Sequence, residues 1–140
     1  MILVDTNIIS ELMRPQPHEH VVKWLSKQPL YHLYISSVTV TEIMYGLNRM
    51  PDGKRKISLI TQFNQLIEHA FYGRILTFGY EEALVAAKFR AERLNSGHEL
   101  HFADAQIAAI AHVHQCAVAT RNIKDFQGLD LSLINPFVSE

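Results

Sequence analysis

The sequence predicts an α/β sandwich with a mostly parallel central sheet. Short apolar runs alternate along the chain with longer segments of helical periodicity. The apolar runs lack polar alternation, which indicates buried strands, and parallel neighbours need a helical crossover between them. The 140 residues, 48% of them hydrophobic, are enough to build one core, and no repeat, low-complexity tract or linker divides them. We therefore expect a single domain over residues 1–140.

The first strand and helix are predicted at the start of the chain. Ile2–Val4 is a short apolar run and reads as a buried strand. Asp5 has a side chain suited to an N-cap, so a short helix follows, and the proline-containing stretch 14–17 ends it. The apolar spacing from Val21 onward predicts a second, amphipathic helix that ends near Pro29.

A strand and two helices are predicted in the middle of the chain. The strand is Leu33–Ser36, and Ser37 or Thr39 is expected to cap the helix that follows it. Residues 50–53 (MPDG) form a strong turn signal before a long helix that ends at Gly73. The apolar face of this long helix consists of Leu59, Phe63, Leu66, Ile67 and Ala70.

Strands and helices continue to alternate in the last half of the chain. Four apolar residues at helical spacing mark the first helix of this half, namely Leu84, Ala87, Ala91 and Leu94, and Gly97 closes it. The other elements are expected in this order: a strand at Ile75–Phe78 before that helix, then a helix at Ala103–His114, a strand at Ala117–Thr120, a turn or short helix at Asn122–Phe126 and a last strand at Leu131–Ile134.

Charge and cysteine content exclude several classes of function. The formal charge of -1 provides no global basic field, so any polyanion must be recognised locally. Cys116 is the only cysteine, which excludes an intrachain disulfide and a multi-cysteine zinc site and is compatible with a reducing compartment. No segment approaches the roughly 20 apolar residues of a membrane span, and the opening apolar run is too short for a signal peptide. We expect a cytoplasmic protein without a membrane partner.

Polar residues near the carboxyl ends of the predicted strands indicate a ligand crevice, because ligands of open parallel sheets bind there. Asp5 ends the first strand, and Glu42 lies in the helix after the second. Asp104 opens the helix before the fourth strand, and Asn122 and Asp125 follow that strand. If the strands lie side by side, these groups converge.

Each carboxylate also has a purely structural alternative. Asp5 could cap the first helix, Glu42 could complete a capping box with Thr39, and Asp104 could favour the helix dipole. Against this, the residues at helical spacing after Asp104 are apolar, and Glu42 shares its helix face with Val38. A carboxylate on an apolar face needs a partner, and neither face carries a Lys or Arg.

The repulsion within such a cluster favours a divalent cation. Three carboxylate pairs about 5 Å apart, at an effective dielectric constant near 20, repel by roughly 10 kcal/mol in total. This rivals the whole stability of a small domain, about 5 to 15 kcal/mol, so the cluster must take up protons or bind a cation. Oxygen ligands favour Mg²⁺ or Mn²⁺ over Zn²⁺, and such an ion suits phosphodiester hydrolysis.

Four segments of the sequence form a recognisable pattern: 1–7 (MILVDTN), 36–42 (SSVTVTE) with Gly46, 102–109 (FADAQIAA) and 119–126 (ATRNIKDF). Together they resemble the PIN-domain nucleases, most closely the small VapC and FitB type. The resemblance covers essentially the whole chain. It implies a PIN-like fold and a metal-dependent endoribonuclease in which Asp5, Glu42 and Asp104 surround Mg²⁺ or Mn²⁺. It also implies that Asn7 and Thr120 support these acids by hydrogen bonding.

One position departs from the pattern of this family. Many relatives carry a fourth acid where this chain has Asn122, whose amide oxygen can bind a cation but brings no charge. We therefore expect one firmly bound ion, with Asp125 as a possible compensating acid. Glu42 is the expected proton acceptor, and Arg121, beside the acids, is expected to contact the phosphate of the RNA substrate.

The resemblance also implies partners. It predicts a homodimer and a cognate antitoxin of the VapB or FitA type, whose C-terminal segment covers the acidic crevice and which carries operator DNA. Two other functions compete with a nuclease toxin. One is a catalytically weak PIN module that acts mainly as an antitoxin-bound, DNA-associated regulatory complex. The other is a phosphatase with an aspartyl nucleophile, which usually has a second Asp where Asn7 stands.

Overall fold

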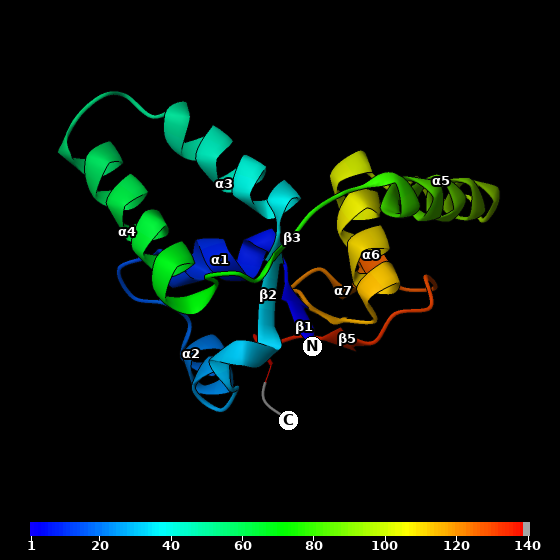
Figure 1. The fold of residues 1–140 in the computed structure, drawn as a ribbon, viewed down its shortest axis with the longest axis horizontal. Helices are drawn as coiled ribbons and strands as arrows, with labels where there is room; N and C mark the ends of the chain where they lie inside the picture. Colours follow the sequence, from blue (N-terminus) through cyan, green and yellow to red (C-terminus); the bar gives the residue numbers. More distant parts are fainter. Residues whose placement is uncertain (139–140) are drawn as a thin grey trace.

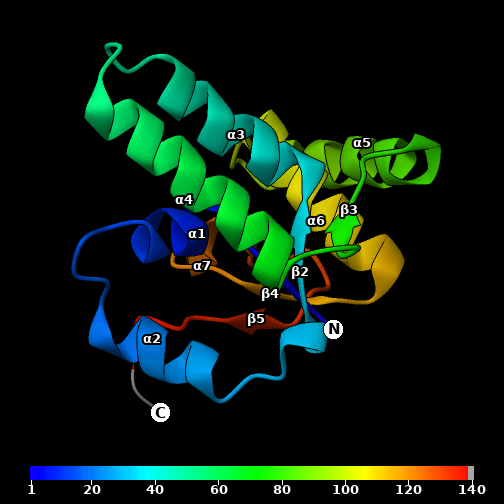
Figure 2. The ribbon, with the colours of Figure 1, turned by 60° about the vertical axis from the view of Figure 1, so that its left-hand side comes forward.

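The computed structural model, which describes residues 1–138, confirms the predicted α/β architecture. Five strands form one parallel sheet in the order β3-β2-β1-β4-β5 (Figures 1 and 2). The central strand β1 (Ile2–Val4) pairs with β2 (Leu33–Ser36) on one side and β4 (Ala117–Ala119) on the other. The sheet ends at β3 (Ile75–Leu76) and β5 (Leu133–Ile134). All strands therefore present their carboxyl ends at the same edge.

Helices cover the sheet in two groups, which Figure 1 shows to its left and right. The helices are α1 (Thr6–Leu12), α2 (Glu19–Ser26), α3 (Ser37–Asn48), α4 (Lys54–Ala70), α5 (Tyr80–Asn95), α6 (Phe102–His114) and α7 (Ile123–Phe126). Two hydrophobic clusters meet at β1. Leu3 belongs to the cluster of α5 and α6, and Val4 belongs to the cluster of α1 to α4. Successive side chains of a strand point to opposite faces, so β1 joins both halves of the core.

The N-caps of α1 and α3 lie at the junctions between strand and helix. Asp5 caps α1, as predicted, and accepts a hydrogen bond from the backbone N–H of Thr6. The cap of α3 is Ser36, whose hydroxyl accepts from the N–H of Thr39 at 3.0 Å. The prediction of Ser37 or Thr39 was wrong, because β2 passes into α3 without a loop and the last strand residue becomes the cap.

All five predicted strands are present. β1 and β2 have the predicted bounds, β4 ends at Ala119 rather than Thr120, and the other two strands are clearly shorter than expected. The strand expected at Ile75–Phe78 ends at Leu76, and the one expected at Leu131–Ile134 starts at Leu133. Both are edge strands, which pair on one side only, so fewer hydrogen bonds hold their ends. The sequence also gave no sign of the short 3₁₀ helix at Leu30–His32, which precedes β2.

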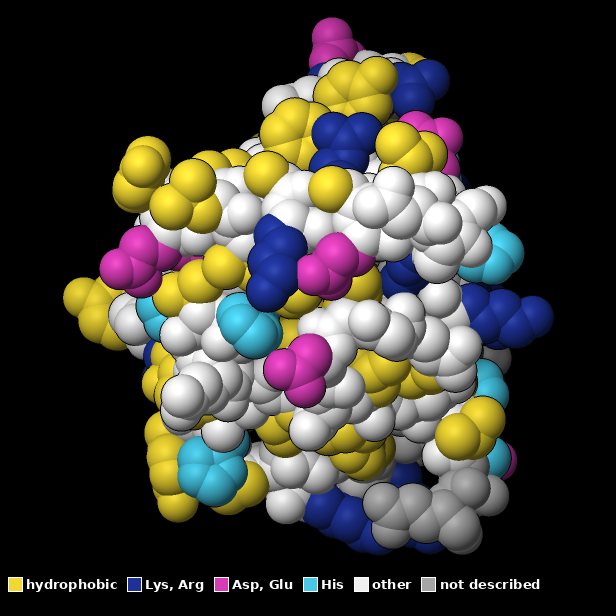
Figure 3. All heavy atoms as spheres, turned by 90° about the vertical axis from the view of Figure 1, so that its right-hand side faces the viewer, with side chains coloured by type: hydrophobic (Ala, Val, Ile, Leu, Met, Phe, Trp, Pro, Cys, Tyr) yellow, Lys and Arg dark blue, Asp and Glu magenta, His cyan; other side chains and the backbone are white. Residues whose placement is uncertain are grey.

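Helix α5 was predicted correctly, but its buried face was not. Its buried residues are Glu82, Ala86 and Phe89, whereas Leu84 and Leu94 are 56% and 67% exposed. The four apolar residues that marked the helix thus form an exposed stripe, which we call the α5 stripe: Leu84, Ala87, Ala91 and Leu94. Figure 3 shows the side of α5 and α6, where hydrophobic side chains reach the surface among charged and histidine side chains.

None of the described helices is both long enough and apolar enough to cross a lipid bilayer.

Candidate functional site

A cavity of about 510 Å³ is lined largely by residues that come from the carboxyl edge of the sheet. Six of the residues predicted to form the site line it: Asp5, Asn7, Glu42, Asp104, Arg121 and Asn122. They come from segments up to 117 positions apart, from Asp5 to Asn122, and the parallel topology brings them together. We call this space the acidic cavity.

Asp5 is the most firmly held carboxylate of the acidic cavity. It is 5% exposed and lies directly after β1. One carboxylate oxygen accepts from the N–H of Thr6 at 2.7 Å. The other accepts from the hydroxyl of Thr120 at 2.8 Å and from the amide of Asn7 at 3.2 Å. The hydrogen bonds expected from Asn7 and Thr120 are therefore present, and they fix the orientation of Asp5.

Glu42 reaches the acidic cavity from α3 and is exposed. Its Oε1 accepts a 2.6 Å hydrogen bond from the hydroxyl of Thr6, which also lies 3.0 Å from the hydroxyl of Thr39. The expected inward position on an apolar face was wrong, since Glu42 faces solvent. The alternative of a capping box was also wrong, because Thr39 lies inside α3 rather than at its cap.

Asp104 lies in the first turn of α6 and is partly buried. Burial raises its pKa to about 6, and the charges of Asp125, Asp5 and Glu42 act in the same direction, while His101 opposes them. The pKa of Asp5 is also raised, mainly by burial and further by Glu42 and Asp125, although its hydrogen bonds oppose the shift. Asp5 and Asp104 therefore feel the charges of the neighbouring acids and hold protons more strongly than isolated carboxyl groups.

The two polar residues after β4 take different positions. Asn122 lines the acidic cavity and is exposed, and its backbone N–H donates to the hydroxyl of Thr120 at 3.0 Å. Asp125 does not line this cavity but borders another one, so it acts on Asp5 and Asp104 through its charge. Arg121 lines the acidic cavity, and its backbone N–H donates to Asn7 at 3.2 Å.

The donor set of the acidic cavity suits a hard cation, because it consists of carboxylate and amide oxygens. Within residues 1–138, however, no three Asp, Glu, His or Cys side chains form a group that could hold a metal ion. Mg²⁺ usually keeps several water ligands and binds through one or two carboxylates, so the acids of the cavity fit such an ion. Burial and the neighbouring acids raise the pKa values of Asp5 and Asp104, and a cation bound beside them would favour their charged forms.

Sequence reasoning missed several residues of the site. Thr6, Ser36 and Thr39 form a chain of hydroxyl groups that leads from the core to Glu42. Glu11 also lines the acidic cavity and is 5% exposed. One signal was available for Glu11, since it stands three positions after Ile8 in the first helix and so shares its buried face.

Comparisons with known proteins identify relatives over nearly the whole chain. The sequence matches the PIN domain family over residues 2–130. It is 42% identical over 137 residues to the toxin FitB of Neisseria gonorrhoeae, covering 98% of this chain and 99% of that protein. It is 37% identical over 137 residues to the VapC ribonuclease Y4jK of Sinorhizobium fredii, covering 98% of each chain.

Solved structures show the same similarity. One is FitAB bound to the IR36 DNA fragment, where a chain with 41% identity superimposes with a TM-score of 0.93 over 100% of this chain and 98% of its own length. Another is FitAcB from Neisseria gonorrhoeae, with 41% identity and a TM-score of 0.92 over 99% of this chain and 100% of its own.

Proposed function

Because this chain belongs to the PIN-domain family, we propose that it is the toxin of a FitAB- or VapBC-like toxin–antitoxin pair. Its activity is that of an endoribonuclease that requires Mg²⁺ or Mn²⁺. The observation that carries the proposal is the convergence of Asp5, Glu42 and Asp104 on one cavity from three separate elements. Relatives named toxin FitB and ribonuclease VapC support the same activity.

Asp5, Asp104 and Glu42 are the residues that would hold the ion, and Asn122 offers a weaker, uncharged oxygen. A bound Mg²⁺ or Mn²⁺ lowers the pKa of a coordinated water and neutralises charge on the scissile phosphate. Thr120 and Asn7 keep the carboxylate of Asp5 in one orientation through their hydrogen bonds. This fixed geometry reduces the reorganisation needed when substrate arrives.

Glu42 is the best candidate for the proton acceptor in RNA hydrolysis. It is exposed and borders the acidic cavity, so water and a phosphate can both approach it. The hydroxyl of Thr6 donates to Oε1, which leaves Oε2 to accept a proton from an attacking water. Arg121 lines the acidic cavity, and its guanidinium group is proposed to contact the RNA phosphate.

The experiment that tests this function is cleavage of RNA by the purified, antitoxin-free protein. We expect cleavage with Mg²⁺ or Mn²⁺, no cleavage with excess EDTA, and recovery when the metal is restored. Sequencing the ends of the products identifies the RNA sites. If the folded protein binds its antitoxin and operator DNA yet leaves RNA intact at every metal concentration, the weak regulatory module suggested by Asn122 is the better description.

We propose that the antitoxin binds to a surface beside the acidic cavity. A second cavity of about 920 Å³ has apolar walls formed by Met13, Ile43, Leu47 and Leu59. It shares Thr6, Ser10, Arg14 and Glu42 with the acidic cavity. A partner segment bound along it would therefore reach the carboxylates, where a basic side chain could take the place of the cation. The related FitAB complex is bound to DNA, so operator DNA is proposed to associate through the antitoxin.

The α5 stripe supports the proposed homodimer. Its residues are spaced by three and four positions, as in a helix that packs against another helix. We expect the double variant Leu84→Glu, Leu94→Glu to shift the protein from dimer to monomer in sedimentation velocity, because each new charge would be buried against its copy. The single variant Val22→Glu, at another exposed apolar position on α2, is the control and should leave the dimer intact. A wild-type protein that sediments as a monomer at every concentration contradicts this dimer.

A further inference from the structure

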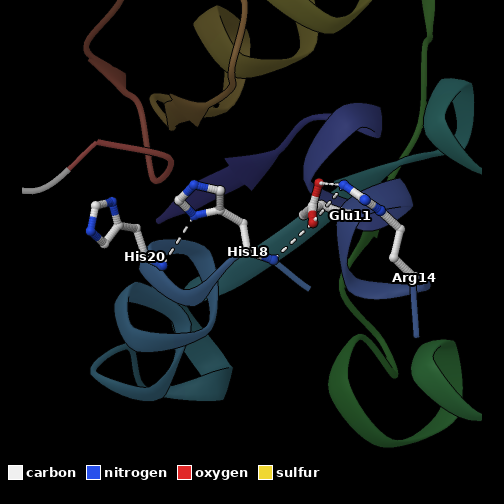
Figure 4. Close-up of polar contacts among 4 residues, drawn as sticks. All are labelled: Glu11, Arg14, His18 and His20. Atoms are coloured by element: carbon white, nitrogen blue, oxygen red, sulfur yellow. Dashed lines mark hydrogen bonds and ion pairs between the residues drawn. The ribbon is translucent and has the colours of Figure 1, made fainter. Parts of the chain in front are cut away.

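Glu11 is a buried carboxylate of the acidic cavity that differs from the other acids. It accepts from the backbone N–H of His18 at 2.8 Å and from Nη1 of Arg14 at 3.2 and 3.4 Å (Figure 4). Burial by itself raises the pKa of Glu11, but these hydrogen bonds and the charge of Arg14 outweigh burial and lower it. Glu11 is therefore ionised and paired, so its role differs from that of the unneutralised acids.

Arg14 is held in place by its ion pair with Glu11, yet its guanidinium group is accessible to solvent. Its side chain is 66% exposed, whereas that of Glu11 is 5% exposed. Among the described residues, its hydrogen bonds to Glu11 use only Nη1. Other N–H groups of the guanidinium thus stay available to a ligand. Arg14 also borders both the acidic cavity and the apolar cavity beside it.

Arg121 is anchored in a different way, by the last described turn of the chain. Its guanidinium carbon lies 4.5 Å from the centre of the Phe137 ring. Phe137 is 9% exposed and is itself held: its N–H donates to Asn135 at 3.0 Å, and its carbonyl oxygen lies 3.0 Å from Nδ1 of His20. The ring of Phe137 also packs edge-on against His18 at 5.5 Å.

The residues that hold the two arginines are connected to each other through His18. His18 binds Glu11 through its backbone and contacts Phe137 through its ring. Arg121 lies beside Asn7, in the first turn of α1. Arg14 follows the end of α1 at Leu12, and both Arg14 and Arg121 line the acidic cavity. A strand of RNA that enters this cavity can therefore meet both side chains.

We propose that Arg14 and Arg121 form a two-point clamp for the RNA backbone, and that Glu11 and Phe137 are positioning residues that hold the two guanidinium groups in place. The inference rests on the proposed ribonuclease function. The clamp would offset a repulsion within the site, because the carboxylates of Asp5, Glu42 and Asp104 line the acidic cavity and repel a polyanionic substrate. Arginine is suited to this task because its planar group binds phosphate oxygens in pairs.

The first test compares steady-state cleavage of a short fluorescent single-stranded RNA at one saturating Mn²⁺ concentration. Arg14→Ala and Arg121→Ala are each expected to raise KM about tenfold and to change kcat less than about twofold, because each removes a charged hydrogen bond to the substrate. Arg49→Ala is the matched control, since Arg49 stacks on Tyr45 and lines neither cavity. Unchanged KM values in both arginine variants would overturn the clamp.

The positioning roles are tested by double-variant cycles. Glu11→Gln is expected to raise KM about threefold when Arg14 is present and not at all in the Arg14→Ala background. If Glu11 only added negative charge, its replacement would lower KM, which contradicts the proposal. Phe137→Leu should likewise raise KM about threefold, in proportion to the lost ring contact, but not in the Arg121→Ala background. Full additivity in either cycle rejects the positioning role. Urea unfolding of each variant verifies that it is folded at the assay temperature.

A binding experiment separates this inference from the proposed activity. Fluorescence anisotropy of labelled single-stranded RNA in EDTA measures affinity as a function of salt. Each arginine variant should weaken binding and reduce the slope of log affinity against log salt by about one phosphate contact. A wild-type protein that binds RNA in this way but cleaves none would refute the ribonuclease function and leave the clamp standing. Cleavage that is indifferent to both arginines would refute the clamp alone.

Discussion

An Asp5→Asn variant is expected to lose RNA cleavage by about three orders of magnitude while remaining folded. Asp5 is the most constrained acid of the cavity, because three hydrogen-bond donors orient its two oxygens. Asn occupies the same volume but brings no charge and has only one acceptor oxygen. Losing this carboxylate removes several kcal/mol of electrostatic stabilisation, and about 4 kcal/mol corresponds to a thousandfold loss of rate. Single-turnover cleavage of a labelled RNA with saturating Mn²⁺ measures the loss.

The matched control for Asp5→Asn is Asp52→Asn. Asp52 is fully exposed, precedes α4 and forms an ion pair with Lys56, so its replacement should leave cleavage within about twofold of the wild type. Circular dichroism shows whether the Asp5 variant keeps its fold. A folded Asp5→Asn protein that cleaves RNA at the normal rate would mean that the catalytic site lies elsewhere.

Asp104→Asn is expected to have two opposite effects: a loss of cleavage of at least about a hundredfold and a gain in stability at neutral pH. The pKa of Asp104 is raised from 3.8 to about 6 in the folded protein. Between these values folding takes up a proton, so the contribution of Asp104 to stability falls as the pH rises through this window. Above about pH 6 the folded protein carries a charge that burial and its acidic neighbours disfavour, and Asn removes that charge.

The size of this gain follows from the shift. A difference of about 2 pKa units corresponds to at most about 3 kcal/mol, and partial exposure reduces this to about 1 to 2 kcal/mol. Urea unfolding in EDTA should therefore show the variant to be more stable than the wild type at pH 7.5 and of equal stability below about pH 4. A variant that is less stable at pH 7.5 would show that Asp104 is held by compensating contacts. Cleavage by the wild type should also decline below pH 6, because protons then compete with the cation.

Most of the fold could be predicted from the sequence, because short-range patterns of residue type indicate where strands, helices and turns form. Apolar runs such as Leu33–Ser36 and the turn signal at 50–53 are readable without any tertiary knowledge, and the buried face of α4 was predicted correctly. The errors arose where local rules compete. Helix α5 has two apolar stripes, and either could have formed its buried face. Packing against α6 buries the stripe that contains Ala86 and Phe89. Spacing alone does not decide between two such stripes.

The predicted residues of the candidate site illustrate the same division. The sequence motifs identified Asp5, Glu42 and Asp104 as site residues. The parallel strand order brings these residues to one cavity. The roles of the hydroxyl groups of Thr6 and Thr39 were not predicted, because their partners lie more than 30 positions away or across an element boundary. Asp125 was expected beside the other acids, yet its place within α7 brings it to a different cavity.

By itself, the amino-acid sequence determined the alternation of strands and helices, the chemistry of the acidic residues and the family, since these depend on residue type and spacing along the chain. The tertiary structure alone decided which acids are buried and which face solvent, as for Asp5 and Glu42. It also decided how Glu11 and Phe137 reach Arg14 and Arg121. Burial and charge coupling depend on distances in space, and residues as far apart as Asp5 and Thr120 become neighbours only when the sheet forms.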